Sequence, residues 1–370
     1  MLYRLLDFLE CPHCFSKFSL VPLNENNVPT SNSDIDLGLL VCENRDVFPL
    51  VRGIPRLFTG SNIVFYEDLR SCLTDISTNI KEIIHQSITK NEQHLDQKFL
   101  HTQKSFSSQW SSIESKDSAW GRDVSQRKDL FMDQFSISPN DLIGKTILDA
   151  GCGHGEVELA LKDTDSEIFA VDLSFSVDYV KNQIEKKESN SNAVFHFIQA
   201  NIHQLPIKKH NFDLVHSAGV LHHTPDTHKG FTIISQRTKP GGRCFIEVYS
   251  TDHMNMIEKF ILIIHNFIRI FSTKLPHSIL HSICFTLSPI LWCFFEVVNL
   301  IMKENKYNRR TLKEVELSLF DGLSPKFRFQ HTTEEVIDWF SSNHYEDIQK
   351  TFHDHNGIGI VGKLKNKILL

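Results

Sequence analysis

The chain has 370 residues, of which 41% are hydrophobic, so it can bury one large core and a smaller second one. Its formal net charge of -6 provides no overall basic surface, which argues against a nucleic-acid substrate. Asp7 and Glu10 interrupt the apolar residues at the start of the chain. We therefore expect no secretion signal, a cytoplasmic location and reduced cysteines.

The N-terminal region is short, rich in turns, and contains three of the eight cysteines. Cys11-Pro12-His13-Cys14 begins like a zinc knuckle, and Cys42 offers a third thiolate. A structural zinc site needs four ligands, and a second Cys-x-x-C pair would end at position 45, which is Arg45. Neither His13, which lies inside the knuckle, nor Asp46 is an obvious substitute. On this ligand count we predict a site without metal.

Strand-like and helical runs alternate in the second half of the chain, which is the pattern of a doubly wound α/β sheet. The predicted strands are Lys145–Ala150, Ile168–Val171, Val194–Ile198, Phe212–Val215 and Arg243–Tyr249. The predicted helices between them are Glu156–Lys162, Tyr179–Lys187 and Phe231–Arg237. A capping box at Thr332 opens one more helix, and Tyr345–Phe352 with Ile358–Leu364 is predicted to close the sheet as an antiparallel pair.

The most informative loop is Gly151-Cys152-Gly153-His154-Gly155, which follows the first strand of this sheet and opens a helix. Glycines allow a sharp turn and a close approach of the backbone to a ligand. Asp172 ends the next strand, where a carboxylate can bind ribose hydroxyls. Dinucleotide-binding folds use G-x-G-x-x-G, whereas the third glycine here comes one residue early. S-adenosylmethionine has no phosphate and does not need that longer spacing.

Five segments resemble, in order and spacing, the five motifs of class I S-adenosylmethionine-dependent methyltransferases of the methyltransferase type 11 kind. They are Ile147–Gly155, Phe169–Ser174, Ala200–Pro206, Phe212–His223 and Lys239–Gly242. The resemblance implies a Rossmann-like doubly wound seven-stranded sheet with an antiparallel C-terminal strand pair. It also implies S-adenosylmethionine as the cofactor.

The resemblance assigns the cofactor contacts to seven residues, which are Asp149, Gly151, Gly153, Asp172, Leu173, Asn201 and Ile202. The first three would hold the methionine part of S-adenosylmethionine, Asp172 the ribose, and the last three the adenine. The family usually has Asp where this chain has Asn201. Asn keeps the carbonyl acceptor but loses the charge.

Two histidines, His222 and His223, lie just after the fourth strand. A hydroxyl acceptor profits from a general base, and histidine titrates near neutral pH, so we predict His222 as the catalytic residue. The alternative, that both histidines only pack or cap the following turn, stays open. Enzymes that methylate the exocyclic amino groups of bases carry an Asn/Asp-Pro-Pro-Tyr-like motif where this chain has Ser217–Leu221. By resemblance, this absence favours O- or C-methylation of a small molecule.

An apolar insertion, Ile257–Met302, separates the fifth strand from the C-terminal pair. No charged residue lies between Lys274 and Glu296, and this segment is long enough to cross a bilayer. Pro289 within it would make a poor spanning helix. We predict a lid over the acceptor pocket, with a homodimer contact or a peripheral membrane contact as further roles. The aromatic residues expected to line the pocket are Phe260, Phe267, Phe271, Trp292, Phe294 and Phe295, and those expected to face water are Lys259, Arg269 and Glu296.

A second resemblance covers Leu6 to Phe58 and rests mainly on Phe48–Leu57. It is to the β-rich ribbon domain of the small tRNA-methyltransferase activator family. The predicted organisation is a ribbon domain at 1–58, a helical linker at 59–140, the S-adenosylmethionine-binding core at 141–250, the apolar insertion at 251–331, and a closing helix and strands at 332–370.

The leading functional prediction is methyl transfer to a small, apolar or lipid- or glycan-linked acceptor. An RNA- or protein-directed methyltransferase is the first alternative, favoured by the ribbon resemblance and opposed by the charge balance. A regulator that binds S-adenosylmethionine without turnover is the second.

Overall fold

The computed structural model describes residues 1–23, 34–70, 82, 86, 103–107, 124–186, 191–252, 254–302, 311–353 and 357–366. Most of the predicted linker at 59–140 lies outside these residues. The N-terminal region forms three short helices and four strands, which are η1 (Tyr3–Asp7), β1 (Phe18–Pro22), β2 (Gly38–Cys42), β3 (Val47–Val51), β4 (Ile54–Leu57), α1 (Ser61–Val64) and α2 (Tyr66–Arg70).

The remainder forms an α/β region with an outlying helical group. Its strands are β5 (Lys145–Ala150), β6 (Ser166–Asp172), β7 (Val194–Ala200), β8 (Phe212–Ala218), β9 (Thr238–Tyr249), β10 (Tyr345–His353) and β11 (Gly357–Leu364). Its helices are α5 (Val124–Phe135), η4 (Pro139–Leu142), α6 (Glu156–Leu161), α7 (Ser176–Lys186), η6 (Ile202–Gln204), η7 (Leu221–His223), α8 (Thr227–Ser235), α9 (Met256–Ser272), α10 (His277–Met302), α11 (Leu312–Leu323) and α12 (Thr333–Ser342).

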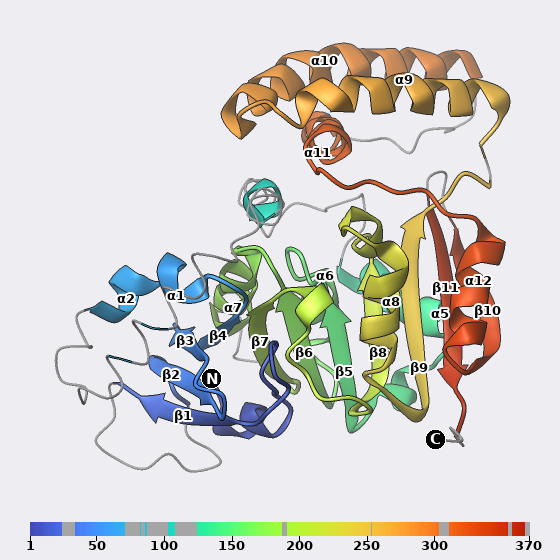
Figure 1. The fold of residues 1–370 in the computed structure, drawn as a ribbon. Coiled ribbons are helices and arrows are strands. Elements are labelled where there is room, and N and C mark those ends of the chain that lie inside the picture. The colour runs from blue at the N-terminus through green and yellow to red at the C-terminus, as the bar shows by residue number, and fades with distance from the viewer. Residues whose placement is uncertain are drawn as a thin grey trace.

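All strands join in one eleven-stranded sheet in the order β1-β2-β3-β4-β7-β6-β5-β8-β9-β11-β10 (Figure 1). The chain runs from β5 outward to β7 and then returns to place β8 on the other side of β5. The direction of winding therefore reverses between β5 and β8, which pair in parallel. In open α/β sheets, ligands bind beyond the carboxyl ends of the strands at such a switch point.

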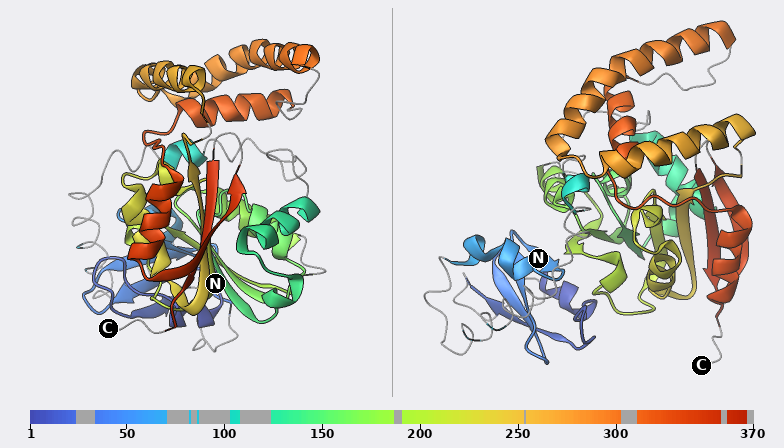
Figure 2. Two further views of the ribbon diagram at one scale, coloured as in Figure 1. Left: turned by 90° about the vertical axis from the view of Figure 1, so that its right-hand side faces the viewer. Right: turned by 45° about the horizontal axis from the view of Figure 1, so that its top comes forward.

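Helices cover both faces of the parallel strands (Figures 1 and 2). On one face, α5, α6 and α7 bury apolar side chains such as Phe131, Leu161 and Val180. On the other, α8 and α12 bury Phe231 and Phe340 against the sheet. Burial on both faces explains why the parallel strands are short apolar runs rather than alternating ones. The predicted opening of α12 is confirmed, since the Thr332 hydroxyl accepts from the Glu335 amide at 3.2 Å.

The expected seven-stranded sheet is the stretch from β7 to β10, but it does not end there. β4 pairs in parallel with β7, through Arg56 with Gln199 and Leu57 with Ala200, so the N-terminal strands continue the same sheet. The expectation of seven strands with a separate ribbon is therefore corrected. The physical reason is that β7 would otherwise expose an unpaired edge, which β4 covers.

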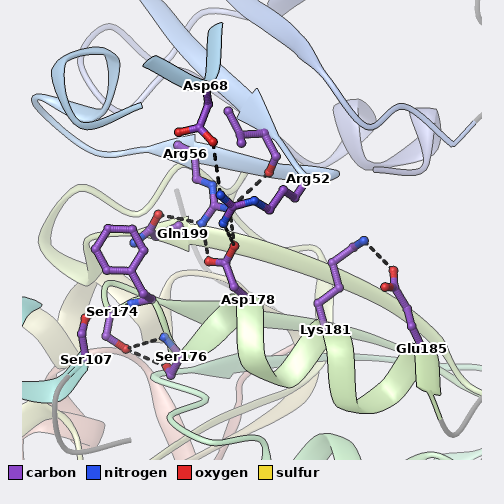
Figure 3. A network of polar contacts seen from close by, with 12 residues as sticks. Arg52, Arg56, Asp68, Ser107, Ser174, Ser176, Asp178, Lys181, Glu185 and Gln199 are labelled. Atoms are coloured by element: carbon purple, nitrogen blue, oxygen red, sulfur yellow. Dashed lines mark hydrogen bonds and ion pairs between the residues drawn. The ribbon is translucent and has the colours of Figure 1, made fainter. Parts of the chain in front are cut away.

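A buried arginine on β4, Arg56, connects the N-terminal strands to β7 and α7 through hydrogen bonds (Figure 3). Arg56 is fully buried and donates to both carboxylate oxygens of Asp178, at 2.6 and 2.7 Å, and to Gln199 Oε1 at 2.9 Å. Its guanidinium also lies 4.4 Å from the centre of the Phe65 ring. Gln199 in turn donates to the Leu173 carbonyl at 3.0 Å, so the network reaches the predicted adenine site.

The apolar insertion forms a helical hairpin, α9 and α10, which stands beyond the carboxyl ends of the parallel strands and rests on α11 (Figures 1 and 2). Five of the six aromatic residues predicted to line a pocket are instead exposed, with Phe260 at 62% and Phe294 at 58%, and Phe295 is half-buried. Arg269, predicted to face water, is buried and donates to the carbonyls of Gly322 and Pro325. These two expectations are wrong because the contact with α11 uses the polar side of α9 and a narrow stripe of α10.

Candidate functional site

The glycine loop after β5 turns back against the end of β6. The amides of Gly151 and Cys152 both donate to the Val171 carbonyl, at 2.7 and 3.0 Å. Gly151 has a φ of 98°, and a Cβ there would come within 2.4 Å of Val220, which follows β8. The loop therefore requires glycine for two reasons, its left-handed backbone and its close approach to the neighbouring loop. This places it at the switch point of the sheet.

Asp172 lies at the end of β6 and holds the glycine loop in place. Its Oδ2 accepts from the Gly153 amide at 2.9 Å, and its Oδ1 accepts from the amide and hydroxyl of Ser174, at 2.7 and 2.6 Å. Burial raises the pKa of the Asp172 carboxyl, whereas these hydrogen bonds act in the opposite direction. Each carboxylate oxygen accepts about two hydrogen bonds, so Oδ2 retains capacity for a ribose hydroxyl. Asp172 is thus predicted to bind ribose and is seen to shape the loop.

A buried acidic pair lies beside the loop, and sequence reasoning found only one member of it. Asp149 bonds to His216 at 2.8 Å. Glu158, in the first turns of α6, is fully buried beside Asp149, and among the described residues no amide, hydroxyl or basic donor reaches its carboxylate oxygens. Burial, followed by the charge of Asp149, raises the pKa of Glu158 well above its usual value. The signal missed in the sequence was a glutamate at an inward-facing position of a short, otherwise apolar helical turn.

The unpartnered Glu158 carboxylate provides a test of the expected cofactor. S-adenosylmethionine carries two positive groups, a sulfonium and an ammonium. A buried carboxyl group with two unused oxygens is satisfied by a cationic ligand and not by an anionic one. The residues beside the loop therefore fit S-adenosylmethionine better than a dinucleotide, whose pyrophosphate is negative.

The predicted adenine residues gather at the carboxyl ends of β6 and β7. Leu173 follows Asp172, and Ile202 is buried at the start of η6. Asn201 caps η6, since its side-chain carbonyl accepts from the His203 amide at 2.9 Å. That oxygen is therefore already in use, and a contact with the adenine amino group would have to share it. The structure brings all seven predicted cofactor residues to one edge of the sheet.

The two histidines after β8 are buried and have different partners. His223 Nδ1 lies 3.0 Å from the Phe327 carbonyl, which identifies it as a donor that fixes the 327–331 segment. His222 Nδ1 accepts from the Tyr249 amide at 3.3 Å, and burial lowers the pKa of His222 well below its usual value. A neutral imidazole with Nδ1 as acceptor carries its proton on Nε2. His222 is therefore arranged as a hydrogen-bond donor, which argues against its predicted role as general base.

A third histidine has the arrangement that a base needs. His331 Nδ1 lies 3.0 Å from the Glu335 carboxylate, so Nδ1 is the donor in this contact. The tautomer with its proton on Nδ1 leaves Nε2 as an acceptor. Within the described part of the chain, neither His331 Nε2 nor His222 Nε2 has a hydrogen-bond partner, and both atoms are buried. His331 pairs with Ser250 at the end of β9, so it lies at the carboxyl edge. The sequence signal was a histidine four residues before a helical glutamate.

Arg328 completes this polar group under the hairpin. Its guanidinium carbon lies 4.4 Å from the centre of the Tyr249 ring, while His222 lies 3.8 Å from the same centre. The Tyr249 hydroxyl donates to Asp321 at 2.8 Å. Two of the guanidinium nitrogens of Arg328 are buried without a partner among the described residues. His222, Arg328 and His331 thus each leave buried nitrogen atoms without hydrogen-bond partners among the described residues.

Comparison with known proteins agrees with this geometry. Residues 148–246 match the family model of the methyltransferase domain. A ubiquinone biosynthesis O-methyltransferase from Coxiella burnetii is 32% identical over 115 residues, which are 31% of this chain and 46% of that protein. A demethylmenaquinone methyltransferase from Lactococcus lactis is 32% identical over 106 residues, 28% of this chain and 41% of the relative. The chain thus spans less than half the length of these curated relatives.

Among solved structures, magnesium protoporphyrin IX methyltransferase from Synechocystis is similar at a TM-score of 0.43 and 12% identity, over 72% of this chain and all of that one. This similarity is too distant to bear on function. The matched residues begin in β5 and end in β9, and they include the glycine loop, Asp172, Asn201 and His222. The match to the methyltransferase-domain family is therefore confined to residues 148–246, the stretch that carries the predicted cofactor residues.

Proposed function

We propose that the protein is a methyltransferase that acts on an oxygen atom of a small, apolar acceptor at a membrane surface. The observation that carries the proposal is the set of unused polar atoms beyond β8 and β9. His331 Nε2 is a hydrogen-bond acceptor, while His222 Nε2 and Arg328 are donors. A hydroxyl or phenol matches this set, because it gives a proton to one group and accepts hydrogen bonds from the others.

The roles of the residues follow from this match. S-adenosylmethionine, when bound, supplies an electrophilic methyl group. His331 takes the proton of the acceptor hydroxyl on Nε2, and the Glu335 carboxylate stabilises the ring that becomes charged. Arg328 and the Nε2–H of His222 stabilise the oxygen anion that remains. The glycine loop and Asp172 fix the position of the cofactor, so that alignment contributes to the rate.

The hairpin supports a membrane location for the acceptor. α10 is long and apolar enough to cross a membrane by length and composition. Its buried stripe, among the residues described, is limited to Leu280, Cys284 and Ser288, which face α11. The large apolar residues exposed on the hairpin are Met256, Ile257, Phe260, Ile261, Ile263, Ile264, Phe267, Ile268, Ile270, Phe271, Ile279, Ile283, Phe285, Leu287, Ile290, Trp292, Phe294 and Val297.

On α9 the exposed apolar residues lie on the side away from α11, and on α10 they flank the buried stripe on both sides. This broad exposure favours lipid over a single protein face. A partner subunit would cover one side of the hairpin and leave the others in water. A helical hairpin lying in the headgroup region would cover most sides at once. The two curated relatives are named for ubiquinone biosynthesis and demethylmenaquinone, which supports a quinone-like acceptor that dissolves in lipid.

The alternative functions have less support from the structure and the sequence. C-methylation of a similar ring uses the same base and donors, and it remains the second candidate for the reaction. An RNA substrate would favour a basic surface, whereas the chain has a net charge of -6.

The experiment that tests the proposal combines labelled methyl transfer with flotation. The purified chain is incubated with methyl-labelled S-adenosylmethionine and either lipid extract, aqueous metabolites or RNA. We expect label only in the lipid extract, bonded to oxygen. On liposome flotation, the protein should rise with the vesicles, and a variant with Phe260, Phe267 and Phe271 changed to Ser should stay at the bottom. The control Phe15→Ser, exposed in the N-terminal region, should float. Label in RNA would overturn the proposal.

A further inference from the structure

The N-terminal region holds a compact group of metal-ligand side chains that the methyltransferase site does not use. Cys11 and Cys14 follow η1, Cys42 ends β2, and Asp46 lies in the turn before β3. Their ligand atoms, three sulfurs and a carboxylate oxygen, all lie within 4.8 Å of one another. Cys11, Cys42 and Asp46 are buried, and Cys14 is half-buried.

The turn between β2 and β3 explains why the spacing of the sequence was misleading. Arg45 adopts a left-handed backbone with a φ of 62°, and its amide bonds to the Cys42 carbonyl at 2.9 Å. This turn leaves Arg45 exposed and directs the next residue, Asp46, toward the sulfurs. The fourth ligand was expected at position 45, where a second Cys-x-x-C pair would end, and the structure offers a carboxylate at position 46 instead.

The contacts within the group suit thiolates held in place by the backbone. The Asp46 amide donates to Cys42 Sγ at 3.3 Å, and the hydroxyl of Ser16 lies 3.1 Å from Cys14 Sγ. The sulfurs of Cys14 and Cys42 are 3.7 Å apart, too far for a disulfide, whose S–S bond is about 2.05 Å.

His13 supplies a second layer of support. Its Nδ1 lies 3.1 Å from Asp46 Oδ2, while its Nε2 lies 3.3 Å from the Thr59 hydroxyl. Thr59 in turn contacts Gln204 at 3.4 Å, at the end of η6. Metal-bound carboxylates are commonly oriented by such outer partners. The chain of contacts runs from the cysteines to the helix that carries the predicted adenine residue Ile202.

We propose that Cys11, Cys14, Cys42 and Asp46 bind one divalent zinc ion as a four-coordinate structural site. Three thiolates with one carboxylate are a ligand set that selects zinc over calcium or magnesium, which prefer oxygen ligands only. Binding displaces the thiol protons to solvent and involves no change in oxidation state. The ion joins the knuckle after η1 to the β2–β3 turn, two segments that no strand pairing connects directly, and so fixes the part of the N-terminal region next to η6.

The metal content of the full-length protein tests this proposal. Protein purified with reductant and without chelator should contain about one zinc per chain by elemental analysis. Replacement of zinc by cobalt should give the thiolate charge-transfer bands and the intense visible bands of a tetrahedral site. Cys11→Ser and Asp46→Asn should each reduce the zinc content well below one per chain. Cys293→Ser, which removes an exposed cysteine of α10, should leave it unchanged.

Two further measurements keep the result clear if the cysteine variants do not fold. In the wild-type protein, titration of the thiols with a mercurial reagent should release zinc to a coloured chelator in proportion to the cysteines modified. His13→Ala keeps all four ligands and should weaken zinc affinity by about 10–100-fold. The proposal is overturned if the reduced wild-type protein contains no zinc and takes up no cobalt, or if mass spectrometry shows a disulfide between Cys14 and Cys42.

Discussion

Two regions meet at the carboxyl ends of the parallel strands: the cofactor side around the glycine loop and the acceptor side beyond β8 and β9. They differ in how many of their buried polar groups have hydrogen-bond partners. On the cofactor side, Asp172 already accepts three hydrogen bonds from the chain, and the glycine loop is fixed by backbone bonds to Val171. On the acceptor side, His222, Arg328 and His331 keep buried polar atoms without partners among the described residues. The glycine loop and Asp172 are therefore preorganised by the chain itself, and Glu158 is the buried group on this side that keeps unused oxygens. Under the proposed function, the acceptor side is completed by its substrate. Unused buried groups are costly, so they mark where a ligand is expected.

The largest expected effect is on the acceptor side. His331→Gln removes the proposed base and should lower kcat by about 10²–10⁴-fold while leaving the affinity for S-adenosylmethionine nearly unchanged. His228→Gln, an exposed histidine on α8, is the matched control and should keep full activity. Steady-state kinetics with calorimetry on both variants separates the two outcomes. Equal loss of turnover and of cofactor affinity would remove the distinction between the two sides.

The next effect concerns the buried Arg56 network, which connects β4 to β7 and α7 next to the cofactor side. Arg56→Ala leaves Asp178 and Gln199 without their buried partner and should lower the free energy of unfolding by about 3–5 kcal/mol. Arg52 also contacts Asp178, at 3.4 Å, but its side chain is mostly exposed. Arg52→Ala should therefore cost about 1 kcal/mol or less. Denaturant unfolding of both variants checks this; similar losses would mean that the buried network does not join the two regions.

A smaller effect is expected from the ribose contact itself. Asp172→Ala removes a charged acceptor whose hydrogen bonds contribute about 1.5–3 kcal/mol each, so affinity for S-adenosylmethionine should fall at least about tenfold. Asp141→Ala, an exposed aspartate that caps η4 at the opposite end of β5, should bind normally. Calorimetry measures both. Unchanged affinity in Asp172→Ala would assign this residue to loop structure alone.

The smallest expected effect is a release of protons when S-adenosylmethionine binds. Burial and the charge of Asp149 raise the pKa of Glu158, so without a ligand its carboxyl keeps its proton to a higher pH than an exposed glutamate does. A cationic cofactor favours the ionised form, so binding should release up to one proton, and affinity should increase as pH rises toward that raised pKa. Calorimetry in buffers of different ionisation enthalpy should detect this release in the wild type. Glu158→Gln should abolish it, and persistence in that variant would exclude Glu158 as its source.

The helices and strands around the glycine loop could be predicted from the sequence because their signals are local, while the roles of the cofactor residues stay predictions. Glycines, an acid at a strand end and alternating strands and helices follow from backbone geometry, and strands were found at each of the predicted positions in the α/β region. The pairing of β4 with β7 was not predicted, since nothing in either strand specifies a partner more than a hundred residues away. His331, Glu158 and the place of Asp46 were missed for the same reason. Each acts through contacts that only the tertiary fold creates.

The side of the α9–α10 hairpin that is exposed could not be predicted from the sequence either. The sequence of α10 is apolar on most sides, and on α9 the polar side, not the apolar one, contacts the protein. Periodicity alone therefore did not show which side of each helix packs on α11. The buried position of Arg269 depends on the carbonyls of Gly322 and Pro325, which the chain reaches only after α10.

The most direct test of the central claim is transfer of labelled methyl from S-adenosylmethionine into a lipid extract by the wild-type protein and the His331→Gln variant. We predict a lipid-soluble product methylated on oxygen with the wild type. With His331→Gln we predict at least about a hundredfold less product, although the cofactor still binds. Absence of label in every fraction with the wild type, despite bound S-adenosylmethionine, would contradict the account, as would label recovered in RNA or protein.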